Sequence, residues 1–143
     1  MLPVLHSLKY TPDAVEHQFA ALAHLPWAML LHSGFADHSD NRFDILVADP
    51  RCTLTTRGKQ TEIDENGTLS HSAEDPLSLL AAKLDDAAMQ ATARDDLPFQ
   101  GGALGLFGYD LGRRFEALPE LAASQLTTPD MAVGIYDWAL IAD

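Results

Sequence analysis

The apolar residues near the start of the chain recur with the spacing of a helix. Val15, Phe19 and Leu22 fall on one face, so we predict a helix that begins after Thr11 and ends before Pro26. Thr11 suits the N-cap position, and the proline that follows it is favoured in the first helical turn. Pro26 ends the pattern because its ring removes the backbone donor that a helix needs.

Two short apolar runs follow, and each is typical of a strand that is covered on both faces. They span residues 27–31 and 42–48. Residues 37–41 between them are polar, so we predict a loop that joins the two strands. The pattern therefore places a polar corner, which begins at His32, between two buried strands.

The middle of the chain alternates between apolar and polar residues, as partly exposed strands do. Glu65-Asn66-Gly67 is a hairpin signal within this region. The predicted strands, which we expect at a solvated edge of a sheet, are 52–56, 60–63 and 68–71. A second helix is predicted to begin at Pro76 with Asp75 as its cap. The apolar face of this helix would carry Leu77, Leu80, Leu84 and Ala88.

Residues 97–116 hold five of the nine glycines of the chain, set between large apolar side chains. Glycine in such a run indicates that another backbone approaches where a Cβ atom would clash. We predict a buried strand over residues 101–107 and a short helix over 109–116. The glycine spacing fits neither the dinucleotide fingerprint nor the phosphate-binding loop, so no nucleotide site is predicted.

The last apolar run, over residues 131–141, predicts a long strand with no polar tail or helix after it to cover it. A strand of this kind needs a partner, and we therefore expect the chain to be a piece of a longer protein. The fold class that the elements predict is α+β, with mostly antiparallel sheet and a few helices. At 143 residues we expect one domain, 1–143.

Composition and charge exclude several classes of function. The chain has 21 acidic and 9 basic residues, and its net charge of −12 would repel a nucleic-acid backbone. The N-terminus lacks the features of a signal peptide, and no apolar run reaches the roughly 18 residues that span a bilayer. The single cysteine, Cys52, excludes an intrachain disulfide and fits a reducing compartment. We expect a cytoplasmic protein with neither a nucleic-acid nor a membrane partner.

The sequence contains no complete set of catalytic or metal-binding residues. The six histidines do not have the spacing of the known metal-binding motifs. Cys52 lies in an alternating strand, where a nucleophilic thiol is not expected. Asp110 with Arg113 and Arg114 has helical spacing and predicts a structural ion pair. We therefore predict no catalytic residue and no metal site within these 143 residues.

Three segments together resemble one known family. Residues 25–34, 97–116 and 129–141 are similar, in this order, to the N-terminal region of component I of aminodeoxychorismate synthase. That enzyme belongs with the large subunit of anthranilate synthase among the chorismate-using enzymes. The most specific part is the run F-Q-G-G-x-x-G-x-F-G-Y-D, which occupies residues 99–110.

The resemblance implies an α+β enzyme that aminates chorismate at C4, in the route to 4-aminobenzoate and folate. Its ammonia would come from a glutamine amidotransferase subunit, the partner in a heterodimer. The resemblance also implies that chorismate and Mg²⁺ bind in a C-terminal chorismate-binding domain, which residues 1–143 do not include. This agrees with the lack of a catalytic set.

The resemblance further implies that a tryptophan, as a structural ligand, occupies the corner between the first two strands. The residues assigned to it are Ser33, Asp40, Asn41, Arg42 and Phe43. Asp40 departs from the family pattern, because close relatives have an aromatic residue there. Anthranilate synthase reads Leu-Leu-Glu-Ser at this corner, where tryptophan acts as a feedback inhibitor. Here His32 replaces the glutamate, which favours the aminodeoxychorismate branch and argues against feedback inhibition.

The residue types at the corner suit an amino-acid ligand. Phe43 would form an aromatic wall for the ring, and Ser33 with nearby backbone groups would make polar contacts. Arg42 would pair with the carboxylate of the ligand, although an ion pair with Asp40 or Asp44 is equally compatible with the sequence.

Two hypotheses of different classes remain. In the first, the chain is the tryptophan-binding and scaffolding part of the chorismate-aminating enzyme. In the second, it is a stand-alone module without catalysis that binds a small molecule or the amidotransferase. The discriminating observation is whether the reading frame continues past Asp143 into a chorismate-binding domain.

Overall fold

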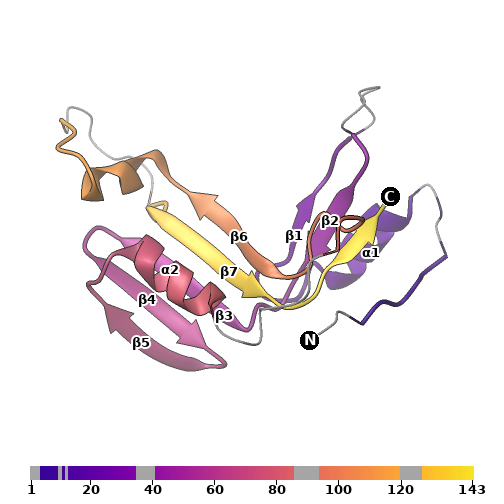
Figure 1. Ribbon diagram of the computed structural model, residues 1–143, viewed down its shortest axis with the longest axis horizontal. Coiled ribbons are helices and arrows are strands. Elements are labelled where there is room, and N and C mark those ends of the chain that lie inside the picture. Colours follow the sequence, from indigo (N-terminus) through magenta and orange to yellow (C-terminus); the bar gives the residue numbers. More distant parts are fainter. Residues whose placement is uncertain (1–3, 10, 12, 35–40, 86–93, 120–126) are drawn as a thin grey trace. The chain divides into compact units, whose positions relative to one another are not determined.

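The computed structural model describes residues 4–9, 11, 13–34, 41–85, 94–119 and 127–143. Within them two antiparallel sheets combine with few helices, which confirms the predicted α+β class (Figure 1). The elements in chain order are α1 (Ala14–Leu22), β1 (Met29–Leu31), β2 (Asp44–Val47), β3 (Cys52–Arg57), β4 (Gln60–Glu65), β5 (Thr68–Ser72), α2 (Pro76–Leu84), β6 (Gly102–Phe107), the 3₁₀-helix η2 (Tyr109–Arg114), β7 (Met131–Tyr136) and β8 (Leu140–Ala142).

The chain divides into two compact units. The first unit consists of Met1–Pro50, Asp86–Gly102 and Tyr136–Asp143, and the second consists of Arg51–Asp85 and Ala103–Ile135. The predicted single domain stays a prediction, because a division by packing does not test whether the parts unfold separately.

The sheet of the first unit has the strand order β1-β2-β8. Both pairs are antiparallel, and Leu46 of β2 lies opposite Leu30 and Leu140. Helix α1 packs against β2, whose Leu46 and Val47 are fully buried. By contrast β1 is an edge strand with Leu31 half exposed, so its predicted burial on both faces is wrong.

Both strands of this corner are shorter than the apolar runs predicted. Trp27 precedes β1 with a φ of 53°, a left-handed conformation that a strand does not accommodate. Its carbonyl accepts a hydrogen bond of 2.9 Å from the hydroxyl of Tyr136. That hydroxyl belongs to a fully buried side chain, and burial raises the pKa of Tyr136 to about 12. Arg42 and Phe43, which we predicted to begin the second strand, lie before β2.

The sheet of the second unit has the order β5-β4-β3-β7-β6. The predicted meander is confirmed, and Asn66 and Gly67 form its hairpin turn with φ angles of 52° and 82°. Along β3, buried residues alternate with half-buried ones, and α2 packs on this strand (Figure 1). Thr56 is buried, and its hydroxyl lies 2.9 Å from that of Thr61 on β4. Of β3, β4 and β5 only β5 is at an edge of the sheet, so the prediction that all three strands lie at a solvated edge is wrong.

The two helices begin differently from each other. Asp75 caps α2 as predicted, because its Oδ1 accepts a hydrogen bond of 2.8 Å from the backbone N–H of Ser78. At α1 the N-cap is Asp13 instead of the predicted Thr11. The predicted apolar face of α2 is only partly correct, since Leu80 is buried while Leu77 is 40% exposed. Ala88 lies outside the described residues.

The glycine segment forms a strand, β6, but not a buried one. It is the outermost strand of its sheet, and Leu106 and Phe107 are 44% and 50% exposed, so the predicted burial is wrong. The predicted close approach is confirmed at Gly105. A Cβ atom there would overlap the carbonyl oxygen of Ala132 and lie 2.8 Å from the Cα of Val133. The short helix that follows is the 3₁₀-helix η2.

The predicted last strand is two strands that belong to different sheets. Strand β7 lies between β3 and β6, and β8 pairs with β2. Asp137, Trp138 and Ala139 interrupt the run between them. The apolar run is long because it serves two cores in succession, and each of its strands finds a partner within the chain. Strand β8 has a neighbour on one side only, so the expectation of a partner from outside the chain stays a prediction for that strand.

Candidate functional site: the corner between β1 and β2

The corner is the connection from Leu31, the last residue of β1, to Asp44, the first residue of β2. These strands pair directly, with Leu31 opposite Ile45, so the connection must reverse the chain direction. The structure describes residues 32–34 and 41–43 of it. The predicted site residue Asp40 lies outside the described residues.

Ser33 joins the two sides of the corner. Its backbone N–H donates to Asp44 Oδ1 over 2.7 Å, and its hydroxyl donates to the carbonyl of Phe43 over 2.5 Å. Both groups are half buried. The Ser33 hydroxyl, which we expected to contact a ligand, thus donates its hydrogen bond within the chain. Its oxygen can still accept a hydrogen bond from a ligand.

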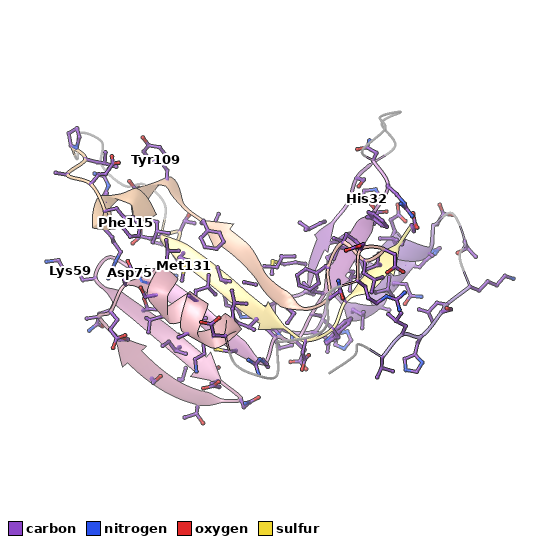
Figure 2. All side chains as sticks on the ribbon, viewed as in Figure 1. His32, Lys59, Asp75, Tyr109, Phe115 and Met131 are labelled. Atoms are coloured by element: carbon purple, nitrogen blue, oxygen red, sulfur yellow. The ribbon has the colours of Figure 1, made fainter. Side chains whose placement is uncertain are left out.

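His32, which is labelled in Figure 2, directly follows β1 and lies between two carboxylates. Its Nδ1 lies 3.1 Å from Asp44 Oδ1, and its Nε2 lies 3.9 Å from Oε1 of Glu16 on α1. Asp44 Oδ1 therefore contacts both His32 and Ser33, and the side chain of Asp44 is only 20% exposed.

Arg42 makes a two-point ion pair with Asp143. Its Nε and Nη2 donate to Oδ1 and Oδ2 of that carboxylate over 2.5 and 2.6 Å. The hydrogen bond raises the pKa of the Arg42 guanidinium and lowers the pKa of the Asp143 carboxyl. The alternative ion pair with Asp44 is not formed, because that carboxylate faces His32 and Ser33.

Phe43 is half buried, and the guanidinium carbon of Arg42 lies 4.6 Å from the centre of its ring. This is a cation–π distance. The ring predicted to form an aromatic wall is therefore half buried, and a cation of the protein lies over it. Asn41 is also half buried. The structure thus brings together four of the five predicted residues, namely Ser33, Asn41, Arg42 and Phe43.

Asp143 is the residue that sequence reasoning missed. It lies 101 positions from its partner Arg42, so no local pattern connects the two. The pairing of β2 with β8 brings them together, since Asp44 lies opposite Ala142 and Asp143 directly follows Ala142. To find this contact, the sequence analysis would have had to recognise residues 140–142 as a separate strand that pairs with β2.

The chemistry that this corner supports is binding of a carboxylate and an aromatic ring. Within the described ranges no group of three His, Cys, Asp or Glu side chains is placed to hold a metal ion. The resemblance implies a Mg²⁺ site outside residues 1–143, and that site stays a prediction. Cys52 is buried, and desolvation raises the pKa of its thiol, which opposes a nucleophilic role.

The predicted ion pair on the short helix is confirmed for one arginine only. Arg113 donates to Asp110 over 2.7 Å. Arg114 instead donates to the backbone carbonyls of Gly58 and Glu74, over 2.7 and 3.1 Å. It therefore ties η2 to the turn after β3 and to the approach to α2.

None of the described helices has both the length and the hydropathy that crossing a membrane requires.

Comparison with known proteins gives long matches. No protein-family model matches the sequence. The chain is 60% identical over 141 residues to aminodeoxychorismate synthase component 1 of Escherichia coli (strain K12) and 58% identical to that of Klebsiella aerogenes. Each match covers 99% of this chain and 31% of the relative, so the chain spans about a third of their length.

A solved structure has a similar fold. Anthranilate synthase component I from Streptococcus pneumoniae TIGR4 superposes with a TM-score of 0.58 at 23% sequence identity. The match covers 96% of this chain and 29% of the other. At this identity the likeness establishes the fold and nothing further.

Proposed function

Because the chain belongs over its own length to the family of aminodeoxychorismate synthase component 1, we propose that it is part of an enzyme that aminates chorismate at C4. The observation that carries the proposal is the identity of 60% across 99% of the chain. The product would be 4-amino-4-deoxychorismate, which leads to 4-aminobenzoate and folate. Ammonia would come from a glutamine amidotransferase subunit, and the enzyme would work in the cytoplasm.

In this proposal the 143 residues have a tryptophan-binding and scaffolding role, and they carry no catalytic residue. Chorismate and Mg²⁺ would be held by a C-terminal domain outside this segment. The burial of the one thiol supports this division, because a buried thiol is a poor nucleophile.

The division of roles can be tested by an activity assay. The 143-residue chain and the complete gene product are each incubated with chorismate, ammonium and Mg²⁺, and aminodeoxychorismate is measured. We expect product from the complete gene product and none above blank from the segment. Product from the segment would show that it carries the catalytic residues itself, and no product from either would overturn the proposed reaction.

We further propose that the corner between β1 and β2 binds tryptophan through Ser33, Arg42, Phe43 and the 40–41 backbone. Three features support this ligand. The Phe43 ring offers an aromatic wall, Arg42 is a cation suited to a carboxylate, and the partly exposed carboxylates of Glu16 and Asp44 lie near. An α-amino group would be attracted to such carboxylates.

A titration tests the tryptophan site and its aromatic wall. Tryptophan is titrated by calorimetry into the complete gene product and into its Phe43→Ala variant. We expect Phe43→Ala to weaken binding, because the ring contact is lost. The matched control is Phe107→Ala on β6, which removes a half-exposed phenylalanine from the other unit.

The outcomes separate the parts of this proposal. If the complete gene product contains no tryptophan and binds none at millimolar concentration, the ligand assignment is wrong. If it binds tryptophan and both phenylalanine variants bind equally well, the ligand stands and the aromatic wall does not. Neither outcome affects the proposed reaction, which the activity assay tests.

A further inference from the structure

The ion pair of Arg42 with Asp143 has the geometry in which arginine binds a free carboxylate. Two nitrogen atoms of the guanidinium donate to the two oxygens of one carboxylate, over 2.5 and 2.6 Å. This parallel two-point contact is how arginine recognises carboxylates in general. The α-carboxylate of an amino acid would present the same two oxygens to the same two donors.

Asp143 reaches this position because of the sheet. Strands β2 and β8 are antiparallel, with Asp44 opposite Ala142. Continuation of the register by one residue places Asp143 opposite Phe43, diagonal to Arg42. Arg42 and Asp143 both lie just beyond their strands, where the alternation of faces along a strand no longer fixes the side-chain directions, and their side chains meet there. The pair is thus formed by adjacent strand ends of one sheet.

The same guanidinium also lies over the Phe43 ring, at 4.6 Å from its centre. Arg42 therefore engages both groups on which the proposed amino-acid site depends. A ligand that stacks on this face of the ring must displace the guanidinium, and a ligand carboxylate that takes the Nε and Nη2 donors must displace Asp143. The pair is accessible for this exchange, because the side chains of Arg42 and Asp143 are 63% and 52% exposed.

We propose that Asp143 is an internal competitor for the amino-acid ligand, and that binding transfers Arg42 from the Asp143 carboxylate to the α-carboxylate of the ligand. The inference rests on the proposed tryptophan site and adds to it the residue that sets its affinity. Asp143 acts through Arg42 and does not itself touch the ligand.

The ionisation of Asp143 supports its role as a competitor. An aspartate carboxyl is charged at neutral pH, and the hydrogen bond from Arg42 lowers the pKa of Asp143 further below its ordinary value. A charged carboxylate competes with a ligand carboxylate on equal terms, whereas an amide at the same place has only one acceptor oxygen and no charge.

The effect on affinity follows from the fraction of molecules in which Arg42 is released. The apparent affinity is the intrinsic affinity reduced by that fraction. Exposed ion pairs are weak, so removal of the competitor is expected to strengthen binding on the order of twofold to fivefold. A ligand without a carboxylate has no use for the released arginine, and its affinity is expected to stay the same.

The experiment compares two ligands across a set of variants. Tryptophan and tryptamine, which lacks the carboxylate, are titrated by calorimetry into the complete gene product after dialysis. The variants are Asp143→Asn, Arg42→Ala and the control Asp137→Asn, which removes an exposed carboxylate from the connection between β7 and β8. Thermal melts verify that each variant is folded.

We expect Asp143→Asn to bind tryptophan more tightly and tryptamine with unchanged affinity. Asp137→Asn should leave both affinities unchanged, which excludes a general effect of net charge. Arg42→Ala should abolish the advantage of tryptophan over tryptamine. Tryptophan affinity that is unchanged or lower in a folded Asp143→Asn variant would overturn the proposal.

Two further outcomes keep this inference distinct from the proposed tryptophan site. If the wild type and Asp143→Asn both bind tryptophan with equal affinity, the site stands and the competitor does not. If neither binds it at millimolar concentration, both are wrong. Should Asp143→Asn be unfolded, the Nε–H resonance of Arg42 in the wild type decides, since it must shift on addition of tryptophan and not of tryptamine.

Discussion

At the scale of single residues, two glycines of β6 are required for different physical reasons. At Gly105 the backbone of β7 fills the space where a Cβ atom would lie, so the constraint is packing. At Gly102 the nearest atom to such a Cβ belongs to Phe99 at an ordinary 3.7 Å, but the φ angle is +140°. The constraint there is the backbone conformation, which other residues rarely adopt. Glycine is thus required at one position of β6 by packing and at another by the backbone conformation.

We expect Gly105→Ala to lower the free energy of unfolding by about 1–3 kcal/mol, because β6 must move away from Ala132 and Val133 to admit a methyl group. Urea denaturation measures the change. The matched control is Gly112→Ala in η2, where a new Cβ atom would lie 3.6 Å from Leu118. An equal loss of stability in both variants would show that the approach of β7 is not the cause.

At the scale of elements, the α-helices α1 and α2 both begin at an aspartate, and only α2 is capped by the side chain of that aspartate. Asp75 has φ and ψ of −58° and 123°, an extended conformation from which its carboxylate reaches the N–H of Ser78. Asp13 has φ and ψ of −103° and 20°, and its side chain makes no cap hydrogen bond. Whether an aspartate caps a helix therefore depends on its backbone conformation as well as on its residue type.

Asp75→Ala is expected to reduce the free energy of unfolding by about 0.5–2 kcal/mol, the usual range for loss of an N-cap hydrogen bond. Asp13→Ala serves as the control, because it removes the same charge from a helix start without removal of a cap. Thermal or urea denaturation compares the two variants. A loss from Asp13→Ala as large as that from Asp75→Ala would assign the effect to the helix dipole.

At the scale of the whole molecule, neither compact unit is continuous in sequence. The chain passes between the units four times, after Pro50, Asp85, Gly102 and Ile135. Two of these passages fall within strands, namely β6 and β7. When one unit unfolds, the other loses the anchored ends of its own segments. The predicted single domain is compatible with this connectivity.

We therefore expect the chain to unfold in one cooperative transition. Gly105→Ala perturbs the second unit, and Tyr136→Phe perturbs the first by removal of the hydrogen bond to Trp27. Both variants should lower the same midpoint when unfolding is followed by circular dichroism and by tryptophan fluorescence. Two transitions, each sensitive to only one variant, would contradict the single domain.

The local pattern of the sequence determined most elements and their type. Helix α2 and its cap, the hairpin at Asn66 and Gly67, and the close backbone approach at Gly105 were all predicted. Each depends on neighbours in the chain or on the chemistry of one residue type, which a sequence displays directly. The α+β class was predicted from the same local signals, and the resemblance to a known family was recognised from residue motifs.

Only the tertiary structure decided which strands lie at an edge and which residues meet across the corner. Burial of β6 was predicted wrongly, because glycine and apolar composition do not reveal whether a neighbour lies on one side or on both. The division of residues 131–141 into β7 and β8 was missed because both halves are apolar, although they enter different sheets. The contact between Arg42 and Asp143 depends on that division. Strand pairing determines it across 101 positions, a separation over which no sequence period extends.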